Sequence, residues 1–501
     1  MANVVLWWNV VCNLQNDDTQ MGTTCHSDVS GVTHHVDAMG NISAVVPRLP
    51  SLNLFYHLRN HAEVASFQTV QRVFSARGYQ RTEDMNSTSI LWTHTYPYQV
   101  DPQSRPLHEM VLAMNPEQTI NHFPGMEPIF NKHIFSTSMK SKYIPKTFLL
   151  PNQKREFLQE MNNTGETRLW MKKNFNHRGN VLKEAKDHDL NQKSLIQQFI
   201  GNQFTVAGHA IQIGVRVILT SVEPMRAYIF HDVSNRVANK PFYPINIADN
   251  QTYLTDGEFR DEVYLSLYSL PETKTYMKTH GYSRWVAVKT YARKQGLDAS
   301  KVMPQLLEAV RGVLLNLRPR LVRQYKQYFK DRAQRERSNL LEFSRWDFIV
   351  DEDLNAYLLE ANLSPELHTR NPMSNIAIAR ALYNLMELTR QSNDARVRDG
   401  NVNILRGVCY EQRCQHCKDK ECQLCAQCLS SSDKTILKTT FAEHINRKGY
   451  LRTYPEPMTQ EEASLPYHTS TDNDVNSWSK IDILNREWLR LKCIHDYYWC
   501  N

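Results

Sequence analysis

Carboxylate and amide side chains recur at short spacing in the stretch WDFIVDEDLNAYLLEANLSPE, residues 346–366. If WDFIVD and AYLLEAN are antiparallel strands, Asp347 approaches Glu360, and alternation places Glu360 and Asn362 on one face. Two carboxylates and an amide oxygen are ligands that Mg²⁺ prefers, so this hairpin is a candidate site for a metal ion with nucleotide phosphates. The alternative is a hairpin whose acids are solvated, and the acids of the turn at 351–353 fit that description.

A second set of ligand-type side chains is the cysteine-rich stretch CYEQRCQHCKDKECQLCAQC, residues 409–428. Its paired C-x-x-C spacing, with His416 nearby, is typical of structural zinc sites in a compartment where disulfides are rare. In a secretory compartment the same cysteines would form disulfides, with fifteen connectivities open to them. We favour zinc, in a structural and not a catalytic role. The six candidate ligands are Cys409, Cys414, Cys417, Cys422, Cys425 and Cys428.

Length and composition limit the class of protein that carries these residues. The chain has 501 residues, of which 41% are hydrophobic and 22% charged, which predicts a globular protein with one large composite fold or two to three domains. The formal charge of +7 favours an acidic partner. We find no apolar run long enough to span a membrane and no convincing signal peptide, so we expect a cytoplasmic protein. Asn41, Asn86, Asn162 and Asn250 begin glycosylation sequons, which matter only if the chain enters the secretory route.

Several apolar runs predict the elements that position these side chains. TRLWMKK at 167–173, SLIQQFI at 194–200, and the consecutive runs at 211–221 and 224–232 predict a mostly antiparallel sheet. Apolar residues at helical spacing over 301–337 predict long amphipathic helices interrupted at Pro319.

The same helical region is rich in basic side chains. Nine Lys and Arg residues stand against two acids, which predicts either a solvated face or a surface that binds an acidic polypeptide. The nine are Arg311, Arg318, Arg320, Arg323, Lys326, Lys330, Arg332, Arg335 and Arg337.

Four motifs in chain order resemble one known family. WDFIVDEDLNAYLLEANLSPELH resembles the C-terminal signature of the tubulin–tyrosine ligase-like family, and INHFPGM resembles its NHFPG loop. LIQQFIGNQFTVAGH and VILTSVEPMRAYIFHDVSNRVA are similar to two further motifs of that family. The likeness covers about residues 90–390, and the C-terminal cysteines mark the chain as a divergent member.

The resemblance implies an α+β fold of the ATP-grasp type, in which two lobes clamp ATP, preceded by a small α/β N-terminal domain. On this basis we expect a weakly ordered arm at 1–50, an α/β domain at 51–145, a central lobe at 146–235, a C-terminal lobe with the metal hairpin at 236–400, a cysteine module at 401–435 and a tail at 436–501.

The resemblance also implies a reaction. Family members use ATP and Mg²⁺ to activate a protein carboxylate as an acylphosphate, which the amine of a free amino acid then attacks. The implied acceptors are the acidic C-terminal tails of tubulin or microtubules, with glutamate as the added amino acid, in the cytoplasm and without nucleic acid. A secretory-lumen ligase for another acidic protein is the alternative location and acceptor.

Motif by motif, the resemblance assigns roles to residues of this chain. It implies magnesium ligands, a lysine that reaches the ATP phosphates, a hinge that meets adenine, a loop arginine and an arginine near the transferring phosphate. These are Asp347, Glu360 and Asn362; Lys172 or Lys173; Gln197, Phe199 and Ile200; Arg178; and Arg236.

The chain also departs from the family pattern. Ala210, Gln212 and Gly214 stand where the family has a lysine, an acid and an arginine, and Leu267 replaces an asparagine. Arg216 is a candidate to substitute for the missing arginine, because it lies two residues beyond Gly214 on the same strand face. These losses support an alternative function, in which the protein binds nucleotide or microtubules without ligase turnover and acts as a regulator or adaptor.

Overall fold

The computed structural model divides the chain into two units, residues 1–49 and 50–501. In the first unit, β1 (Thr33–Val36) pairs antiparallel with β2 (Ile42–Val45), and the rest of the expected arm lies outside the described residues. The structure describes residues 33–36, 42–45, 51–55, 67–99, 104–115, 118–173, 180–255, 261–330, 339–369, 371–389, 402, 407–418, 422–465 and 479–501.

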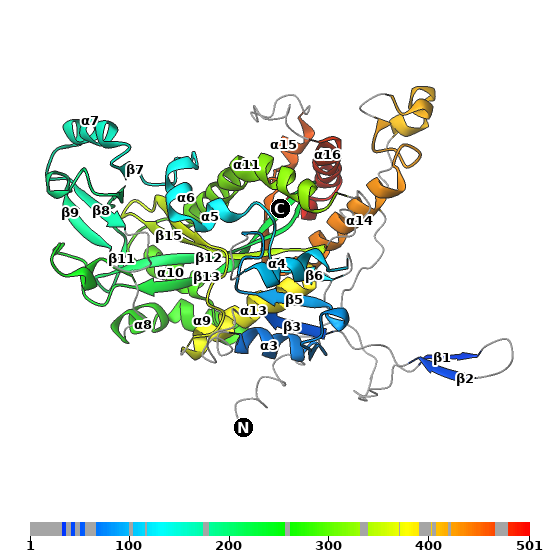
Figure 1. The fold of residues 1–501 in the computed structure, drawn as a ribbon, viewed down its shortest axis with the longest axis horizontal. Helices are drawn as coiled ribbons and strands as arrows, with labels where there is room; N and C mark the ends of the chain where they lie inside the picture. Colours follow the sequence, from blue (N-terminus) through cyan, green and yellow to red (C-terminus); the bar gives the residue numbers. More distant parts are fainter. Residues whose placement is uncertain are drawn as a thin grey trace. The chain divides into compact units, whose positions relative to one another are not determined.

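A six-stranded antiparallel sheet carries the predicted hairpin (Figure 1). Five of the strands follow the order β16, β15, β12, β13, β17. The sixth, β11, stands outside this order and pairs with β12. The two consecutive strands expected at 211–221 and 224–232 are confirmed as β12 and β13, and so is the antiparallel pairing. The strands are β11 (Thr205–Val206), β12 (His209–Val222), β13 (Met225–Val237), β15 (Glu342–Val350), β16 (Ala356–Asn362) and β17 (Tyr450–Tyr454).

Helices bury both faces of β12, which explains why its sequence is a continuous apolar run. Val217 belongs to a core cluster that includes α11 (Val302–Tyr328), whereas the next residue, Ile218, packs in the cluster of α13 (Pro372–Leu388). Successive strand residues point to opposite faces, so the two helices cover opposite sides of the sheet.

The interruption expected at Pro319 is wrong, because α11 runs unbroken through that residue. An internal proline costs a helix about 3 kcal/mol. Leu317 and Leu321, on either side of it, are almost fully buried, and burying such a side chain contributes about 1.5–3 kcal/mol each. Packing against the sheet therefore outweighs the local cost of the proline.

A second antiparallel sheet holds the strands predicted at 167–173 and 194–200, which are confirmed. α7 (Lys154–Thr164) covers it, with the ring of Phe157 5.2 Å from that of Trp170. In order, its strands are β7 (Thr147–Leu150), β10 (Ser194–Gln198), β8 (Leu169–Lys173) and β9 (Val181–Glu184).

A third, parallel sheet lies near the start of the second unit, and with it the α+β class is confirmed. One of its strands, β14, comes from residues 339–340, so the N-terminal part of this unit does not build the sheet alone. In order, the strands are β14 (Asn339–Leu340), β6 (Thr119–Ile120), β5 (Ile90–Thr93), β3 (Ser51–Phe55) and β4 (Gln80–Arg81). The remaining α-helices are α3 (Gln68–Ser75), α4 (Arg105–Leu112), α5 (Glu127–Phe130), α6 (Lys132–Ser138), α8 (Asp261–Tyr268), α9 (Pro271–His280), α10 (Arg284–Lys294), α14 (Ser431–Asn446), α15 (Gln460–Ser464) and α16 (Lys480–His495).

The C-terminal segment, which we expected as a tail, is built into the central sheet. β17 pairs with β13, and Glu443 of α14 accepts hydrogen bonds from Arg226 and Tyr228 of β13. Asp482 of α16 pairs with Arg318 of α11 and accepts a hydrogen bond from the amide of Met225. Among the described residues, no helix is both long enough and apolar enough to cross a membrane.

The basic side chains of α11 are largely engaged by acids of other elements. Arg311 pairs with Glu456 at 2.5 Å, and Arg320 pairs with Glu127 at 2.6 Å. Lys326 likewise pairs with an acid, Glu223, and Arg318 with Asp482. These four therefore hold other elements against the helix. The solvated face is wrong for the buried Arg318, whereas the side chains of Arg320 and Lys326 are 40% and 46% exposed. Arg332, Arg335 and Arg337 lie outside the described residues.

Candidate active site

The acidic hairpin has the register that alternation predicts. Asp347 of β15 lies directly opposite Glu360 of β16, and the next pair is Phe348 with Leu358. The register is regular from the pair of Asp347 and Glu360 to Arg345 opposite Asn362, so alternation places Asn362 on the face of Asp347, where its Nδ2 donates to Oδ2 at 3.0 Å. The three predicted metal ligands thus come together on one face of the sheet.

Arg345, which sequence reasoning missed, holds Asp347 from two residues away. Its Nε and Nη2 donate to the two carboxylate oxygens, each at 2.8 Å. Asp347 is almost fully buried; burial raises its pKa, and the Arg345 guanidinium opposes that shift. Strand alternation places Arg345 on the face of Asp347, a signal that was available in the sequence.

Gly214 makes room for this ion pair, because it lies opposite Asp347 on β12. A Cβ at this position would lie 2.4 Å from Ser234 Oγ, 2.9 Å from Asp347 Oδ1 and 3.2 Å from Arg345 Cδ. Only a residue without a side chain fits such an approach. The guanidinium beside Asp347 therefore comes from β15, the neighbouring strand, and not from position 214.

Arg216, the expected substitute, is buried among other charged and polar groups. Burial lowers its pKa to about 10, and the charged or polar groups that act on it most are Arg284, Tyr450 and Asp232. The structure thus places Arg345, and not Arg216, against the carboxylate of Asp347.

Two lysines surround the second carboxylate. Lys132 of α6 pairs with Glu360 at 2.9 Å, and Lys173 of β8 donates to the backbone carbonyl of Leu359 at 3.4 Å. Burial acts to raise the pKa of Glu360, but the two ammonium groups outweigh it and lower that pKa to about 2. Burial also lowers the pKa of Lys173 to about 8. Lys132 lies outside the motifs that carry the resemblance, and its partner Glu360 is far away in the sequence.

The two candidate lysines of β8 differ in their contacts. Lys172 donates to the side chain of Gln192, on the exposed side of the strand, whereas Lys173 is directed at β16. The contact of Lys173 joins the four-stranded sheet to the six-stranded one.

Arg236 of β13 completes the cationic surroundings. It lies opposite Gln212 in the strand pair. Burial and the charge of Arg345 lower its pKa, and the carboxylates Asp347 and Glu360 act in the opposite direction. Gln212 itself accepts a hydrogen bond from Thr255 at 2.7 Å.

We call Lys132, Lys173, Arg236 and Arg345 the cation cluster. Its four positive charges surround the two carboxylates of Asp347 and Glu360, and a third carboxylate, Glu366, also acts on Arg236 and Arg345. The excess of positive charge makes this face of the sheet a favourable site for an anion such as a phosphate group.

The predicted hinge residues separate into two groups. Phe199 and Ile200 line a cavity of about 360 Å³, together with Tyr357 of β16. Gln197 is buried on the four-stranded sheet, where its side chain donates to Thr147 at 3.1 Å, and it does not line this cavity. Arg178 lies outside the described residues, so its predicted role is neither supported nor opposed.

The hairpin fits a magnesium ion in the chemical type of its ligands, which are carboxylate and amide oxygens. Both oxygens of Asp347 already accept from Arg345, so this ligand becomes available only if the guanidinium moves. Glu360 is paired through Oε2, and Asn362 uses its nitrogen toward Asp347, which leaves an oxygen on each for a cation. Among the described residues, no cluster of three His, Cys, Asp or Glu side chains is arranged as a metal site.

The cysteine-rich segment contains disulfides in place of the favoured zinc site. The sulfurs pair as Cys409–Cys425, Cys414–Cys422 and Cys417–Cys428. Zinc requires the same sulfurs as thiolates, so the structure corresponds to the disulfide alternative. Spacing suits both chemistries, which is why the sequence did not separate them.

The sequence is similar to that of one known protein family and of several of its members. The model of the tubulin-tyrosine ligase family matches residues 110–397. A probable tubulin polyglutamylase of Caenorhabditis elegans is 27% identical over 437 residues, which cover 82% of this chain and 78% of that protein. A tubulin polyglutamylase of Mus musculus is 21% identical over 365 residues, or 69% of this chain and 38% of its own length. A tubulin monoglutamylase of Mus musculus is 21% identical over 282 residues, or 52% of this chain and 22% of its own length. The chain thus spans most of the nematode relative and less than half of each mouse relative.

Proposed function

Because the chain belongs to the tubulin-tyrosine ligase family, we propose that it is an ATP-dependent ligase that joins an amino acid to carboxylates of an acidic protein tail. The relatives are named as tubulin polyglutamylases and a tubulin monoglutamylase, which supports glutamate as the amino acid and tubulin as the acceptor. The observation that carries the proposal is the cation cluster around Asp347 and Glu360, where two sheets meet.

In the proposed reaction, an oxygen of the acceptor carboxylate attacks the γ-phosphorus of ATP and ADP leaves. The amine of the amino acid then attacks the acyl carbon of the resulting acylphosphate, loses a proton and displaces phosphate. Both steps build negative charge on phosphoryl oxygens, which fixed cations stabilise. Arg236 and Lys173 supply those cations in this proposal, with Phe199 and Ile200 beside the adenine, between the two lobes of an ATP-grasp fold. Arg178 stays a predicted contributor from the phosphate loop.

Glu360 and Asn362 are the residues that would hold magnesium, with Asp347 as a third ligand when Arg345 moves aside. Bound there, Mg²⁺ would offset negative charge on the ATP phosphates. Lys132 keeps Glu360 ionised, because its ammonium group helps to lower the pKa of that carboxyl to about 2.

A second candidate function is a relative that binds nucleotide or microtubules without turnover. Two observations favour it: Arg345 occupies Asp347, and Gln212 is bonded to Thr255 where the family resemblance implies an acid. In this case the guanidinium of Arg345 offsets the charge of Asp347 in place of a metal cation, and the protein acts as a regulator or adaptor.

Incubation with ATP, Mg²⁺, microtubules and labelled glutamate distinguishes the two candidates, with glycine and tyrosine tested in parallel. We expect incorporation of glutamate that is abolished in Glu360→Gln and unchanged in Asp353→Asn, an exposed acid in the turn of the same hairpin. If none of the three amino acids is incorporated although ATP binding is measured by calorimetry, the proposal of a ligase that acts on tubulin is wrong, and the second candidate is favoured.

A further inference from the structure

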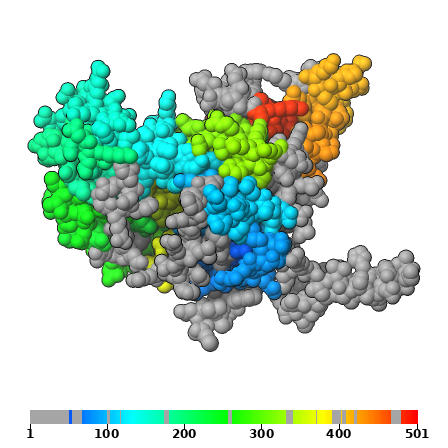
Figure 2. Space-filling view, viewed as in Figure 1, coloured from blue at the N-terminus to red at the C-terminus, as the bar shows by residue number. Residues whose placement is uncertain are grey.

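All eight described cysteines lie in disulfide bonds, in two separate parts of the sequence. Three bonds lie within residues 409–428, a segment on the surface of the molecule (Figure 2, amber). The fourth joins Cys493 to Cys500 near the C-terminus. The other two of the ten cysteines, Cys12 and Cys25, lie outside the described residues.

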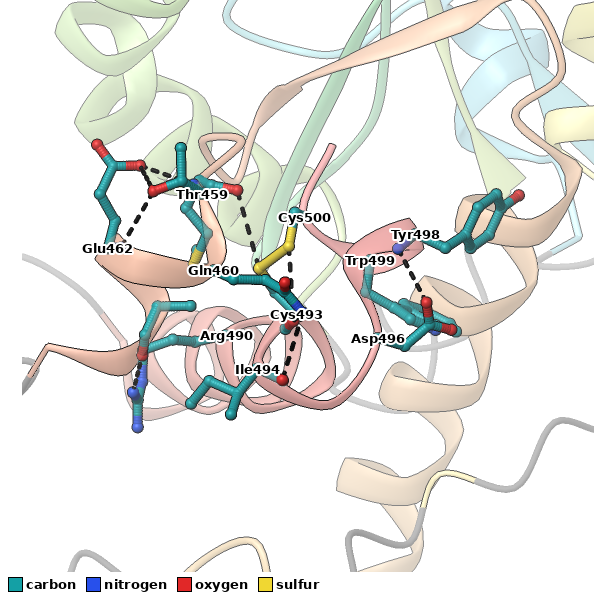
Figure 3. The surroundings of a disulfide bond; sticks show 12 residues. Thr459, Gln460, Glu462, Arg490, Cys493, Ile494, Asp496, Tyr498, Trp499 and Cys500 are labelled. Atoms are coloured by element: carbon teal, nitrogen blue, oxygen red, sulfur yellow. Dashed lines mark hydrogen bonds between the residues drawn. A yellow bond between two sulfur atoms is a disulfide. The ribbon is translucent and has the colours of Figure 1, made fainter.

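The C-terminal disulfide is part of a packed core, which makes it an observation independent of the surface segment. It joins the last turn of α16 to the residues that follow Trp499 (Figure 3). Both sulfurs are buried, and the carbonyl of Cys500 accepts a hydrogen bond from the amide of Met458 at 2.9 Å. Trp499 stacks on His444 of α14, with ring centroids 4.2 Å apart. The carbonyl of Cys500 also accepts a hydrogen bond from Arg452 of β17 at 2.9 Å, so the bond holds in place a residue that contacts the central sheet.

Disulfides persist in oxidising compartments and are rare in the reducing cytosol. We propose that this chain folds in an oxidising secretory compartment and carries N-linked glycans at Asn86, Asn162 and Asn250. Each disulfide forms when two thiols lose two protons and two electrons to a disulfide-exchanging oxidant of that compartment. In each glycan transfer, the asparagine amide nitrogen displaces the lipid pyrophosphate from the anomeric carbon of a lipid-linked oligosaccharide and loses a proton.

The three asparagines are located where a bulky glycan fits. Asn86 lies in the short 3-10 helix Met85–Ser87, Asn162 in the last turn of α7, and Asn250 at the start of Asn250–Thr252; all three are exposed. N-linked glycans belong on surface asparagines of secreted proteins. Asn41, which begins a further sequon, lies outside the described residues.

One further sequon in the described residues serves as a negative control for glycosylation. Asn362-Leu363-Ser364 also matches the sequon, but Asn362 is only partly exposed and its amide nitrogen donates to Asp347 at 3.0 Å. A glycan on that nitrogen would break this contact and fill the candidate active site. The proposal therefore predicts glycans on Asn86, Asn162 and Asn250 and none on Asn362, although all four begin the same motif.

This inference goes beyond the proposed ligase activity, and its readouts do not depend on that activity. Its consequence for the ligase concerns the acceptor. In a secretory compartment the carboxylates within reach are those of lumenal or secreted acidic proteins.

The direct test uses the protein purified from cells that naturally make it. Peptide-N-glycosidase converts a glycosylated asparagine to aspartate, so peptide mapping should find aspartate at positions 86, 162 and 250 and asparagine at 362. Alkylation without prior reduction should leave all eight cysteines of the four bonds unlabelled. Unmodified amides at all three positions, or labelling of all eight cysteines, would overturn the proposal.

Recombinant variants provide a matched pair for the same question. When the full chain is secreted from eukaryotic cells, Asn162→Gln should lower its apparent mass on a gel by the mass of one glycan. Asn163→Gln changes the adjacent exposed asparagine, which is the middle residue of this sequon and not its acceptor, and should leave the mobility unchanged. The full chain made without a leader in the cytosol should melt at a lower temperature than the secreted form. A cytosolic form that binds zinc and melts at the same temperature would contradict the inference.

Discussion

The pairing of Arg345 with Asp347 predicts a large effect of a single substitution, Arg345→Leu. The carboxylate is 1% exposed and the guanidinium 13% exposed, so neither charge is well solvated. The leucine would leave Asp347 with the hydrogen bond from Asn362 and the more distant charge of Arg236. The substitution therefore creates a buried carboxylate without a contacting cation.

Breaking a buried ion pair by removing one partner costs about 3–5 kcal/mol. The two hydrogen bonds that disappear each join charged groups, and such bonds contribute about 1.5–3 kcal/mol. Because Asn362 and Arg236 still act on Asp347, we expect a loss near the lower end, about 3 kcal/mol of unfolding free energy. The double variant Arg345→Leu/Asp347→Asn removes both charges and should lose less than the single variant.

Urea unfolding followed by tryptophan fluorescence measures this loss, because Trp346 lies between the two residues and is fully buried. Arg323→Leu, on an exposed arginine of α11, is the control and should change stability by less than about 0.5 kcal/mol. In Arg345→Leu, added Mg²⁺ should recover part of the stability, since Asp347 is then available as a ligand. A loss below about 1 kcal/mol, or a double variant as unstable as the single one, would refute the reasoning.

Three further predictions concern other contacts. Gly214→Ala should destabilise the protein by about 1–3 kcal/mol, because its Cβ would lie 2.4 Å from Ser234 Oγ; urea unfolding should show a smaller loss when Ser234 is also replaced by glycine. Arg318→Leu should cost about 3–5 kcal/mol in the same assay, because it leaves Asp482 buried without its cation, and an unchanged midpoint would contradict this. Burial, aided by nearby arginines, lowers the pKa of His444 to about 2, far below the unfolded value of about 6.5, so the unfolded state binds the extra proton as pH falls. Unfolding free energy should therefore decrease by about 2 kcal/mol from pH 7 to pH 5, measured by thermal unfolding, and His444→Phe should lack that part of the decrease.

The hairpin was predictable because its information is local. Strand alternation alone brings Glu360 and Asn362 to one face, and a short turn brings Asp347 opposite them. The ion pair with Arg345 was harder to predict, because it depends on Gly214 in a strand far earlier in the chain. Sequence patterns give the face of a side chain but not the space opposite it.

The other failures have similar physical causes. The continuous helix through Pro319 depends on burial of flanking leucines, which local helix rules do not include. The partner of Glu360, Lys132, lies on α6, and no periodicity connects residues so far apart. The six clustered cysteines suit both zinc and disulfides, and only their pairing in space decides between the two.

The position of β17 at the edge of the central sheet affects how the protein can be shortened. The family match ends at residue 397, before this strand begins, so a fragment that stops there would keep β13 but lose its outer partner. The hydrogen-bonding groups of β13 that β17 covers would then face solvent, an arrangement that invites edge-to-edge aggregation. Glu443 would leave with the same segment, and Arg226 would lose the carboxylate that neutralises it. For this chain, the smallest soluble unit therefore extends past the family boundary to include the C-terminal strand and helices.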